Sequence, residues 1–73
     1  MAFLPIITPQ KLTRIVRKQG FVFDRQSGSH AVFIHSDGRR TSIPMHRKTL
    51  GKGLLHKILK DIEITSEDFR ELV

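Results

Sequence analysis

Three short segments rich in β-forming residues follow one another in the middle of the chain, with no helical pattern between them. They cover residues 21–23, 30–35 and 40–43. Asp37-Gly38 is a pair that favours a tight hairpin, and Pro44 ends the third segment because proline cannot donate to a sheet. We therefore predict three consecutive antiparallel strands, joined by turns at residues 25–29 and 36–39.

A helix is predicted before these strands. Thr8 can cap its first turn, and Pro9 suits the first helical position because its missing N–H would have no partner there. Gly20 provides the left-handed residue that commonly follows a helix. Helical spacing turns Leu12, Ile15 and Val16 inward and Lys11, Arg14, Arg17 and Lys18 outward.

Two helices are predicted after the strands. A basic loop with two glycines covers residues 45–53. One face of the next helix is formed by Leu54, Leu55, Ile58, Leu59 and Ile62. Either Thr65 or Ser66 can cap a short last helix, with Glu67 and Asp68 in the first turn, where the helix dipole favours negative charge.

The predicted order is therefore α-β-β-β-α-α, which makes the fold class α+β. Two or three helices cannot cover both faces of a sheet. We therefore expect a three-stranded antiparallel sheet with helices on one face and the other face open. The double-stranded-RNA-binding domain has the same α-β-β-β-α order. A length of 73 residues predicts one domain over residues 1–73. The chain has no cysteine, which excludes disulfides, thiolate metal sites and cysteine nucleophiles.

The charge of the chain is unevenly distributed. The net charge is +6 and the isoelectric point is near 10.6. Residues 1–60 hold twelve Lys and Arg against two acids, whereas residues 61–73 hold one Arg against five acids. A small basic body is typical of proteins that bind polyanions such as nucleic acid. We expect the acidic segment to lie away from that binding surface.

The sequence does not favour a metal site, a cofactor or a serine nucleophile. His30 and His35 stand an odd number of residues apart on one predicted strand, so they point to opposite faces and cannot share an ion. Gly51-Lys52-Gly53 is only a fragment of a phosphate-binding loop. Ser29 lacks a nearby acidic residue that could orient His30 as its base.

Gly28-Ser29-His30 is the candidate catalytic motif. It places an imidazole at the start of a strand, and imidazole exchanges protons near neutral pH. Cleavage of RNA needs a group that takes the proton of a ribose 2′-OH or gives one to the leaving 5′ oxygen. It also needs cations near the phosphate, where negative charge builds up. A histidine among arginines and lysines fits a ribonuclease that needs no metal. A histidine at the start of a strand is more often structural or simply exposed, so the tripeptide alone does not decide between these readings.

The first seven residues are apolar but lack a basic start and are interrupted by Pro5, so they do not resemble a signal peptide. No apolar run approaches the roughly 20 residues that a membrane span needs. We expect a short arm packed on the body, no membrane association, and a protein of the cytoplasm.

The ordered motifs of the chain resemble the HicA (YcfA-like) toxins of bacterial toxin–antitoxin systems. The resemblance runs over nearly the whole chain and is carried by Gly20-Phe21, Arg25-Gln26-Ser27-Gly28-Ser29-His30, Asp37-Gly38-Arg39-Arg40, Ile43-Pro44-Met45-His46, Leu50-Gly51-Lys52-Gly53-Leu54-Leu55, Ile58-Leu59 and Thr65-Ser66-Glu67-Asp68-Phe69. One departure is Ile62-Glu63, where relatives often have Ala-Gly. It leaves open the shape of the last turn of that helix.

The resemblance implies a fold similar to the double-stranded-RNA-binding domain and a ribosome-independent endoribonuclease that acts on mRNA. It assigns the catalytic role to His30 and carries over Pro44-Met45-His46 without a defined task. It also implies a HicB-type antitoxin as partner, with no DNA contact except through that antitoxin. The candidate RNA-binding residues are Ser29, Arg39, Arg40, His46, Arg47, Lys48, Lys52 and Lys57.

Two alternatives remain open on the sequence. His46 is the candidate for a second catalytic group, but no pattern identifies that group. The same basic surface would also serve an RNA-binding module that does not cleave, which would not need the imidazole of His30. A role in protein interaction without RNA is the third reading.

Overall fold

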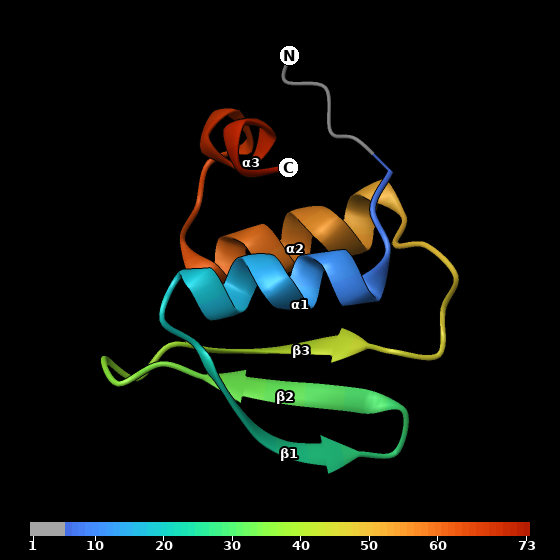
Figure 1. The fold of residues 1–73 in the computed structure, drawn as a ribbon, viewed down its shortest axis with the longest axis vertical. Coiled ribbons are helices and arrows are strands. Elements are labelled where there is room, and N and C mark those ends of the chain that lie inside the picture. The colour runs from blue at the N-terminus through green and yellow to red at the C-terminus, as the bar shows by residue number, and fades with distance from the viewer. Residues whose placement is uncertain (1–5) are drawn as a thin grey trace.

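The computed structural model describes residues 6–73 as a sheet covered by helices (Figure 1). The elements are α1 (Pro9–Lys18), β1 (Val22–Ser27), β2 (His30–Ile34), β3 (Arg40–Pro44), α2 (Lys52–Ile62) and α3 (Ser66–Leu72). The predicted α+β class and the order α-β-β-β-α-α are confirmed. Helices α1 and α2 lie over the sheet, and α3 lies on the far side of them from the strands (Figure 1).

The sheet is antiparallel with the order β1-β2-β3. Its register places Ala31 beside Ile43 and Phe33 beside Thr41 on the face below the helices. Consequently the residues between them in sequence form the opposite face, on which no helix lies in Figure 1. This face is referred to below as the open face.

The predicted turn at residues 25–29 is wrong in its extent. Strand β1 continues to Ser27, and only Gly28 and Ser29 form the turn. Gly28 has a φ of 60°, a conformation that costs glycine little. All six residues of β1 are exposed, so the polar residues that suggested a turn are compatible with an edge strand.

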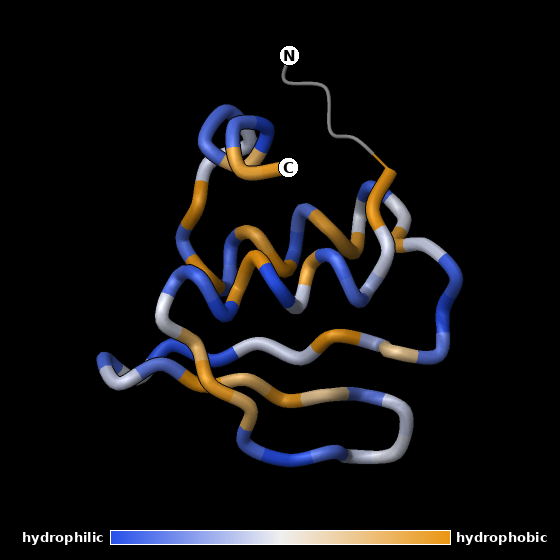
Figure 2. Tube along the Cα trace, in the orientation of Figure 1, coloured by the Kyte–Doolittle hydropathy of each residue, from blue (hydrophilic) through white to orange (hydrophobic). Residues whose placement is uncertain are grey.

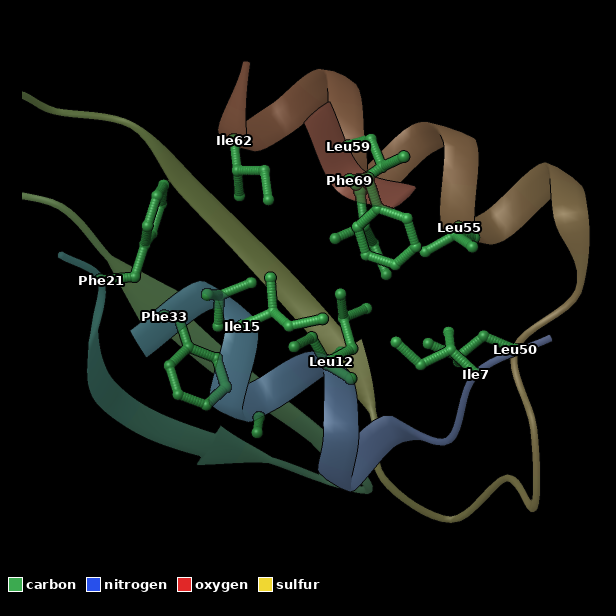
Figure 3. Packing of buried hydrophobic residues seen from close by; sticks show 14 residues of the cluster. Ile7, Leu12, Ile15, Phe21, Phe33, Leu50, Leu55, Leu59, Ile62 and Phe69 are labelled. Carbon is green, nitrogen blue, oxygen red and sulfur yellow. The ribbon is translucent and has the colours of Figure 1, made fainter. Parts of the chain in front are cut away.

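The core lies between the sheet and the helices (Figure 3). Hydrophobic and hydrophilic residues alternate along α1 and α2 (Figure 2), and the hydrophobic residues predicted to face inward are buried, except Leu54, which is partly buried. Phe21 and Phe33 fill the sheet side of the core, and Phe69 brings α3 to it. Each of these rings is about 1% exposed or less. Burying such a side chain contributes roughly 1.5–3 kcal/mol, so the core accounts for most of the stability of this small chain.

The helix caps follow the predictions. Thr8 accepts a hydrogen bond from the Lys11 N–H. Thr65, and not Ser66, caps the last helix by accepting from the Asp68 N–H. Both longer helices end in the same hydrogen-bond pattern around a left-handed residue, which is Gly20 after α1 and Glu63 after α2. The last turn of α2 is therefore regular, although Glu63 occupies a position that favours glycine.

The residue Ile7, in the segment before α1, forms a backbone hydrogen bond with Leu50 near the end of the basic loop. The Leu50 N–H donates to the Ile7 carbonyl at 2.9 Å, and both side chains are buried. The predicted packing of the N-terminal arm is thus seen at Ile7, whereas residues 1–5 lie outside the described residues. The basic loop is shorter than predicted, covering residues 45–51, because α2 already begins at Lys52.

Candidate functional site

His30 is the first residue of β2 and lies on the open face. Its neighbours across the sheet are Ser27 in β1 and Pro44 in β3. The imidazole is exposed, and no residue within the described part of the chain forms a hydrogen bond with it. The position follows from the alternation of the strand, since Ala31 and Phe33 must point into the core.

The loop after β3 brings a second imidazole to His30. The Met45 N–H donates to the Ser29 carbonyl at 2.8 Å, which ties the start of this loop to the turn that precedes His30. The end of the loop is held at Leu50. His46 follows Met45, and the centroid of its ring lies 6.3 Å from that of His30, with 64° between the ring planes. Both rings are close enough to reach one phosphate group.

A hollow of about 300 Å³ lies at this pair of histidines. It is lined by His30, Ser42, Pro44, His46, Arg47, Leu54 and Lys57. Two imidazoles and two cations therefore face a space with an apolar floor. Leu54 belongs to the first turn of α2, whose N-terminus has no side-chain cap, and a helix N-terminus favours anions. The hollow is suited to an anion with transferable protons nearby.

A second hollow, of about 380 Å³, continues along β3 toward its start. It is lined by Val32, Arg40, Thr41, Ser42, Lys57 and Asp61. Ser42 and Lys57 line both hollows, so the two form one groove along the free edge of β3, between the open face and α2. The expectation that the whole acidic segment lies away from the basic surface is wrong for Asp61. Its carboxylate enters the groove because the last turns of α2 run beside β3.

The predicted RNA-binding residues separate into three groups. His46, Arg47 and Lys57 line the hollow at His30, and Arg40 lines the second hollow. Ser29, Lys48 and Lys52 are exposed near that end of the sheet but do not line either hollow. Arg39 is at the other end of the sheet and is held by protein groups.

The surroundings of Arg39 explain why it is not part of the groove. Its Nε lies 2.8 Å from the Asp37 carboxylate, and its Nη1 donates to the Ile62 carbonyl at 2.6 Å. Its guanidinium also lies over the Phe21 ring, 5.2 Å from the centroid. The pKa of Asp37 is lowered, mainly because its carboxylate accepts from the Arg39 backbone N–H. Arg39 thus connects the β2–β3 turn to the end of α2.

The sequence analysis assigned no binding or catalytic role to six residues of the groove, which are Val32, Thr41, Ser42, Pro44, Leu54 and Asp61. The alternation of β3 could have placed Ser42 and Pro44 on the same face as His30 once the register was known. Leu54 was assigned to the core, and it is only partly buried. Nothing in the sequence places Asp61 beside β3.

Within residues 6–73, no group of three or more His, Cys, Asp or Glu side chains is arranged to hold a metal ion. None of the described helices has the length and apolar character required to span a bilayer. These findings concern the described residues alone.

A comparison with known protein families gives a match over most of the chain. The family model described as HicA toxin of bacterial toxin-antitoxin matches residues 9–64, which is most of the chain. The matched range contains β1, β2, β3 and all residues that line the groove. No curated protein matches the sequence.

Proposed function

This chain belongs to the HicA toxin family of bacterial toxin–antitoxin systems, and we propose that it is an endoribonuclease that cleaves mRNA without a metal ion. The observation that carries this proposal is the pair of imidazoles, 6.3 Å apart, above a hollow lined by Arg47 and Lys57. General acid–base chemistry on a phosphodiester needs two groups that exchange protons and cations that stabilise the transition state.

In the proposed reaction His30 removes the proton of a ribose 2′-OH. The 2′ oxygen forms a bond to the adjacent phosphorus, and the bond between phosphorus and the 5′ oxygen breaks. His46 gives a proton to that leaving oxygen, so the products are a 2′,3′-cyclic phosphate and a 5′-OH. We assign the acid to His46 because it is the imidazole nearest to His30.

Arg47 and Lys57 act on the charge of the phosphate. Negative charge increases on the non-bridging oxygens as the 2′ oxygen attacks, and cations fixed beside them stabilise that state more than the ground state. Lys57 comes from α2 and Arg47 from the anchored loop, so the two cations approach the hollow from different elements. Arg40 and the exposed Lys48 and Lys52 would hold the flanking phosphates.

The test is cleavage of a single-stranded RNA in the presence of a chelator by the wild-type chain, His30→Ala, His46→Ala and the double variant. We expect His30→Ala to reduce the rate by about 10²–10⁴-fold. The double variant should cleave RNA only slightly more slowly than the less active of the two single variants, because the two groups act in one step. His56→Ala, an exposed histidine of α2 that lines neither hollow, is the control and should keep the wild-type rate.

Two further readouts make this test specific. An RNA whose single reactive ribose is 2′-deoxy should resist cleavage at that position, and the products of normal RNA should carry a cyclic phosphate. Full activity of the His30→Ala variant would overturn the catalytic assignment. RNA binding without any cleavage by the wild-type chain would favour the non-catalytic RNA-binding module.

The family also implies an antitoxin partner, and we propose a HicB-type protein that covers the groove. The groove is rich in cations, so an acidic surface would associate with it rapidly and specifically. Hydrogen exchange should then slow at residues 30–34 and 45–51 when the antitoxin binds. Protection confined to residues 63–73 would point instead to inhibition from a distance.

A further inference from the structure

A single carboxylate lies in the groove among its cations. Asp61 lines the second hollow together with Arg40 and Lys57, next to the hollow of His30. A carboxylate repels the phosphates of RNA, so its presence on this surface needs another explanation. The groove contains a position that is unfavourable for a phosphate and favourable for a hydrogen-bond donor.

The carboxylate of Asp61 is held in a fixed orientation. Its Oδ2 accepts from the Thr41 hydroxyl at 3.0 Å and from the Lys57 ammonium at 3.3 Å. Thr41 is buried, with 4% of its surface exposed, so its hydroxyl stays in place and restricts the movement of the carboxylate that it binds. The other oxygen, Oδ1, forms no hydrogen bond with residues 6–73. The Asp61 side chain is 30% exposed and lines the hollow, so the carboxylate is in part accessible to a ligand.

The remaining surfaces of the hollow suit a planar base. Val32, only 8% exposed, provides an apolar surface on the open face. Arg40 lies at the same hollow and can contact a phosphate or the face of a base. Lys57 lines both hollows, so a base here would belong to a nucleotide beside the phosphate at His30.

Hydrogen-bond chemistry distinguishes among the four bases at such a position. A carboxylate accepts hydrogen bonds and cannot donate them, whereas the adjacent Lys57 ammonium can only donate. Cytosine and adenine present an exocyclic amino group beside a ring-nitrogen acceptor on the Watson–Crick edge, and guanine does so on its sugar edge, which matches this pair. Uracil has no amino group. Its one N–H is flanked on both sides by carbonyl oxygens, so a carboxylate that accepts from it lies beside an oxygen that it repels. Single-stranded RNA exposes these edges, where proteins read sequence.

We propose that the hollow at Asp61 is a subsite for a base with an exocyclic amino group, and that it disfavours uracil at that position. This inference rests on the proposed ribonuclease function, because it assumes that RNA occupies the groove. The free Oδ1 of Asp61 accepts from the amino group, and Lys57 donates to the neighbouring ring nitrogen or carbonyl. The subsite makes Asp61 a specificity-determining residue and gives it no part in the chemical step.

The experiment compares the binding of 2′-O-methyl octamers of cytidine and of uridine, which the chain cannot cleave. The two pyrimidines have similar size and differ at the edge that Asp61 would read. We expect the wild-type chain to bind the cytidine octamer about tenfold more tightly. In Asp61→Asn, which keeps an acceptor for Thr41 but places an amide group in the hollow, the ratio should fall toward 1.

The control for the loss of a negative charge is Asp24→Asn. Asp24 is ion-paired with Arg25 on β1 and does not line either hollow. Both variants lose a charge that repels phosphate and should bind the uridine octamer somewhat more tightly. Only Asp61→Asn also loses the acceptor for the amino group of cytosine, so only this variant should change the ratio. Thermal unfolding of both variants confirms that the fold is retained.

Either of two results overturns the subsite. The wild-type chain could bind both octamers equally, or Asp61→Asn could keep the wild-type ratio. Cleavage of ordinary RNA by the same preparation reports separately on the proposed function. Normal cleavage with equal binding removes only the base preference, whereas the absence of both cleavage and binding removes the function and the subsite together.

Discussion

The two histidines at the ends of β2 have opposite surroundings. His35 directly follows the strand, and only 20% of its side chain is exposed. Its Nδ1 accepts from the Asp37 backbone N–H and lies 3.0 Å from the Asp37 carboxylate. Its ring packs edge-to-face on Phe21 at 5.1 Å. His30 begins the strand and is exposed, and within residues 6–73 its ring neighbour is His46. We refer to these regions as the closed end and the open end of the sheet.

The difference separates groups that maintain the fold from groups that are available to a ligand. At the closed end, Asp37, Arg39 and His35 satisfy one another and connect the β2–β3 turn to α2. Because folding lowers the pKa of Asp37, its carboxylate stabilises the fold above its unfolded pKa, and this contribution is lost as the pH falls through the folded pKa. At the open end, Arg47 lines a hollow and forms no ion pair with an acid among residues 6–73. The two histidines at the ends of β2 thus have different surroundings, which their sequence context alone does not reveal.

The largest expected effect on stability is that of Gly20→Ala at the closed end. Gly20 has a φ of +95°, and a Cβ there would lie 2.9 Å from His35 Nε2. The His35 ring is held by Asp37 and Phe21, so it cannot move without losing these contacts. We expect a loss of about 2–3 kcal/mol from backbone strain and displacement of His35. Such a loss lowers Tm by on the order of 10–20 °C in a domain of this size.

The matched control for this prediction is Gly28→Ala in the turn at the open end. Gly28 also has a positive φ, of +60°, but a Cβ there would meet nothing within 4 Å. Its cost should therefore be the backbone strain alone, about 1 kcal/mol. Equal losses for the two variants, measured by denaturant unfolding, would show that His35 is not rigidly held.

The second prediction compares an arginine from each end. Arg39→Ala removes the hydrogen bond to the Ile62 carbonyl and the ion pair with Asp37, and should cost about 2 kcal/mol of unfolding free energy. Arg47→Ala removes an exposed side chain and should change stability by less than about 0.5 kcal/mol.

RNA binding should respond in the reverse order. Each phosphate contact to a single strand contributes about −0.7 to the slope of log affinity against log salt concentration. Arg47→Ala should make that slope shallower by about this amount, whereas Arg39→Ala should leave it unchanged. A loss of salt dependence in Arg39→Ala would place RNA at the closed end as well and would contradict the distinction.

The sequence predicted the elements and the faces better than the contacts between elements. The alternation of residues 30–35 predicted opposite faces for His30 and His35, and the structure has His30 on the open face and the His35 ring against the core residue Phe21. The alternation cannot give the register between strands, which here includes a shift between Phe23 and Arg25 in β1. The pairing of His30 with Pro44, and hence the place of His46, depends on the register between β2 and β3.

Contacts distant in sequence were not predictable from local pattern. Arg39 contacts Ile62, 23 residues away, and Thr41 contacts Asp61, 20 residues away. Both contacts depend on how α2 lies along β3, which tertiary packing decides. For this reason the sequence did not show that Arg39 is held by protein groups or that Asp61 lies in the groove.

The smallest expected effect is a gain in stability from Glu63→Gly. Glu63 directly follows Ile62, the last residue of α2, whose carbonyl accepts from Arg39. Glu63 adopts φ 60° and ψ 46°, and its N–H donates to the Lys60 carbonyl, as the Gly20 N–H donates to that of Arg17 after α1. A residue with a Cβ is strained in this conformation, and a negative charge is unfavourable at a helix C-terminus. Glycine removes both costs but loses more backbone entropy on folding. The net gain should be about 0.5–1 kcal/mol.

Glu63→Gln separates the two causes, because it removes the charge and keeps the Cβ. Chemical denaturation measures the free energy of unfolding of both variants. If the strained backbone is the cause, this free energy should increase in Glu63→Gly and change little in Glu63→Gln. Equal gains would identify the charge as the cause. RNA cleavage should be the same in both variants, since Glu63 lies outside the groove. A change in the rate would mean that the end of α2, through Asp61 two residues earlier, adjusts the open end.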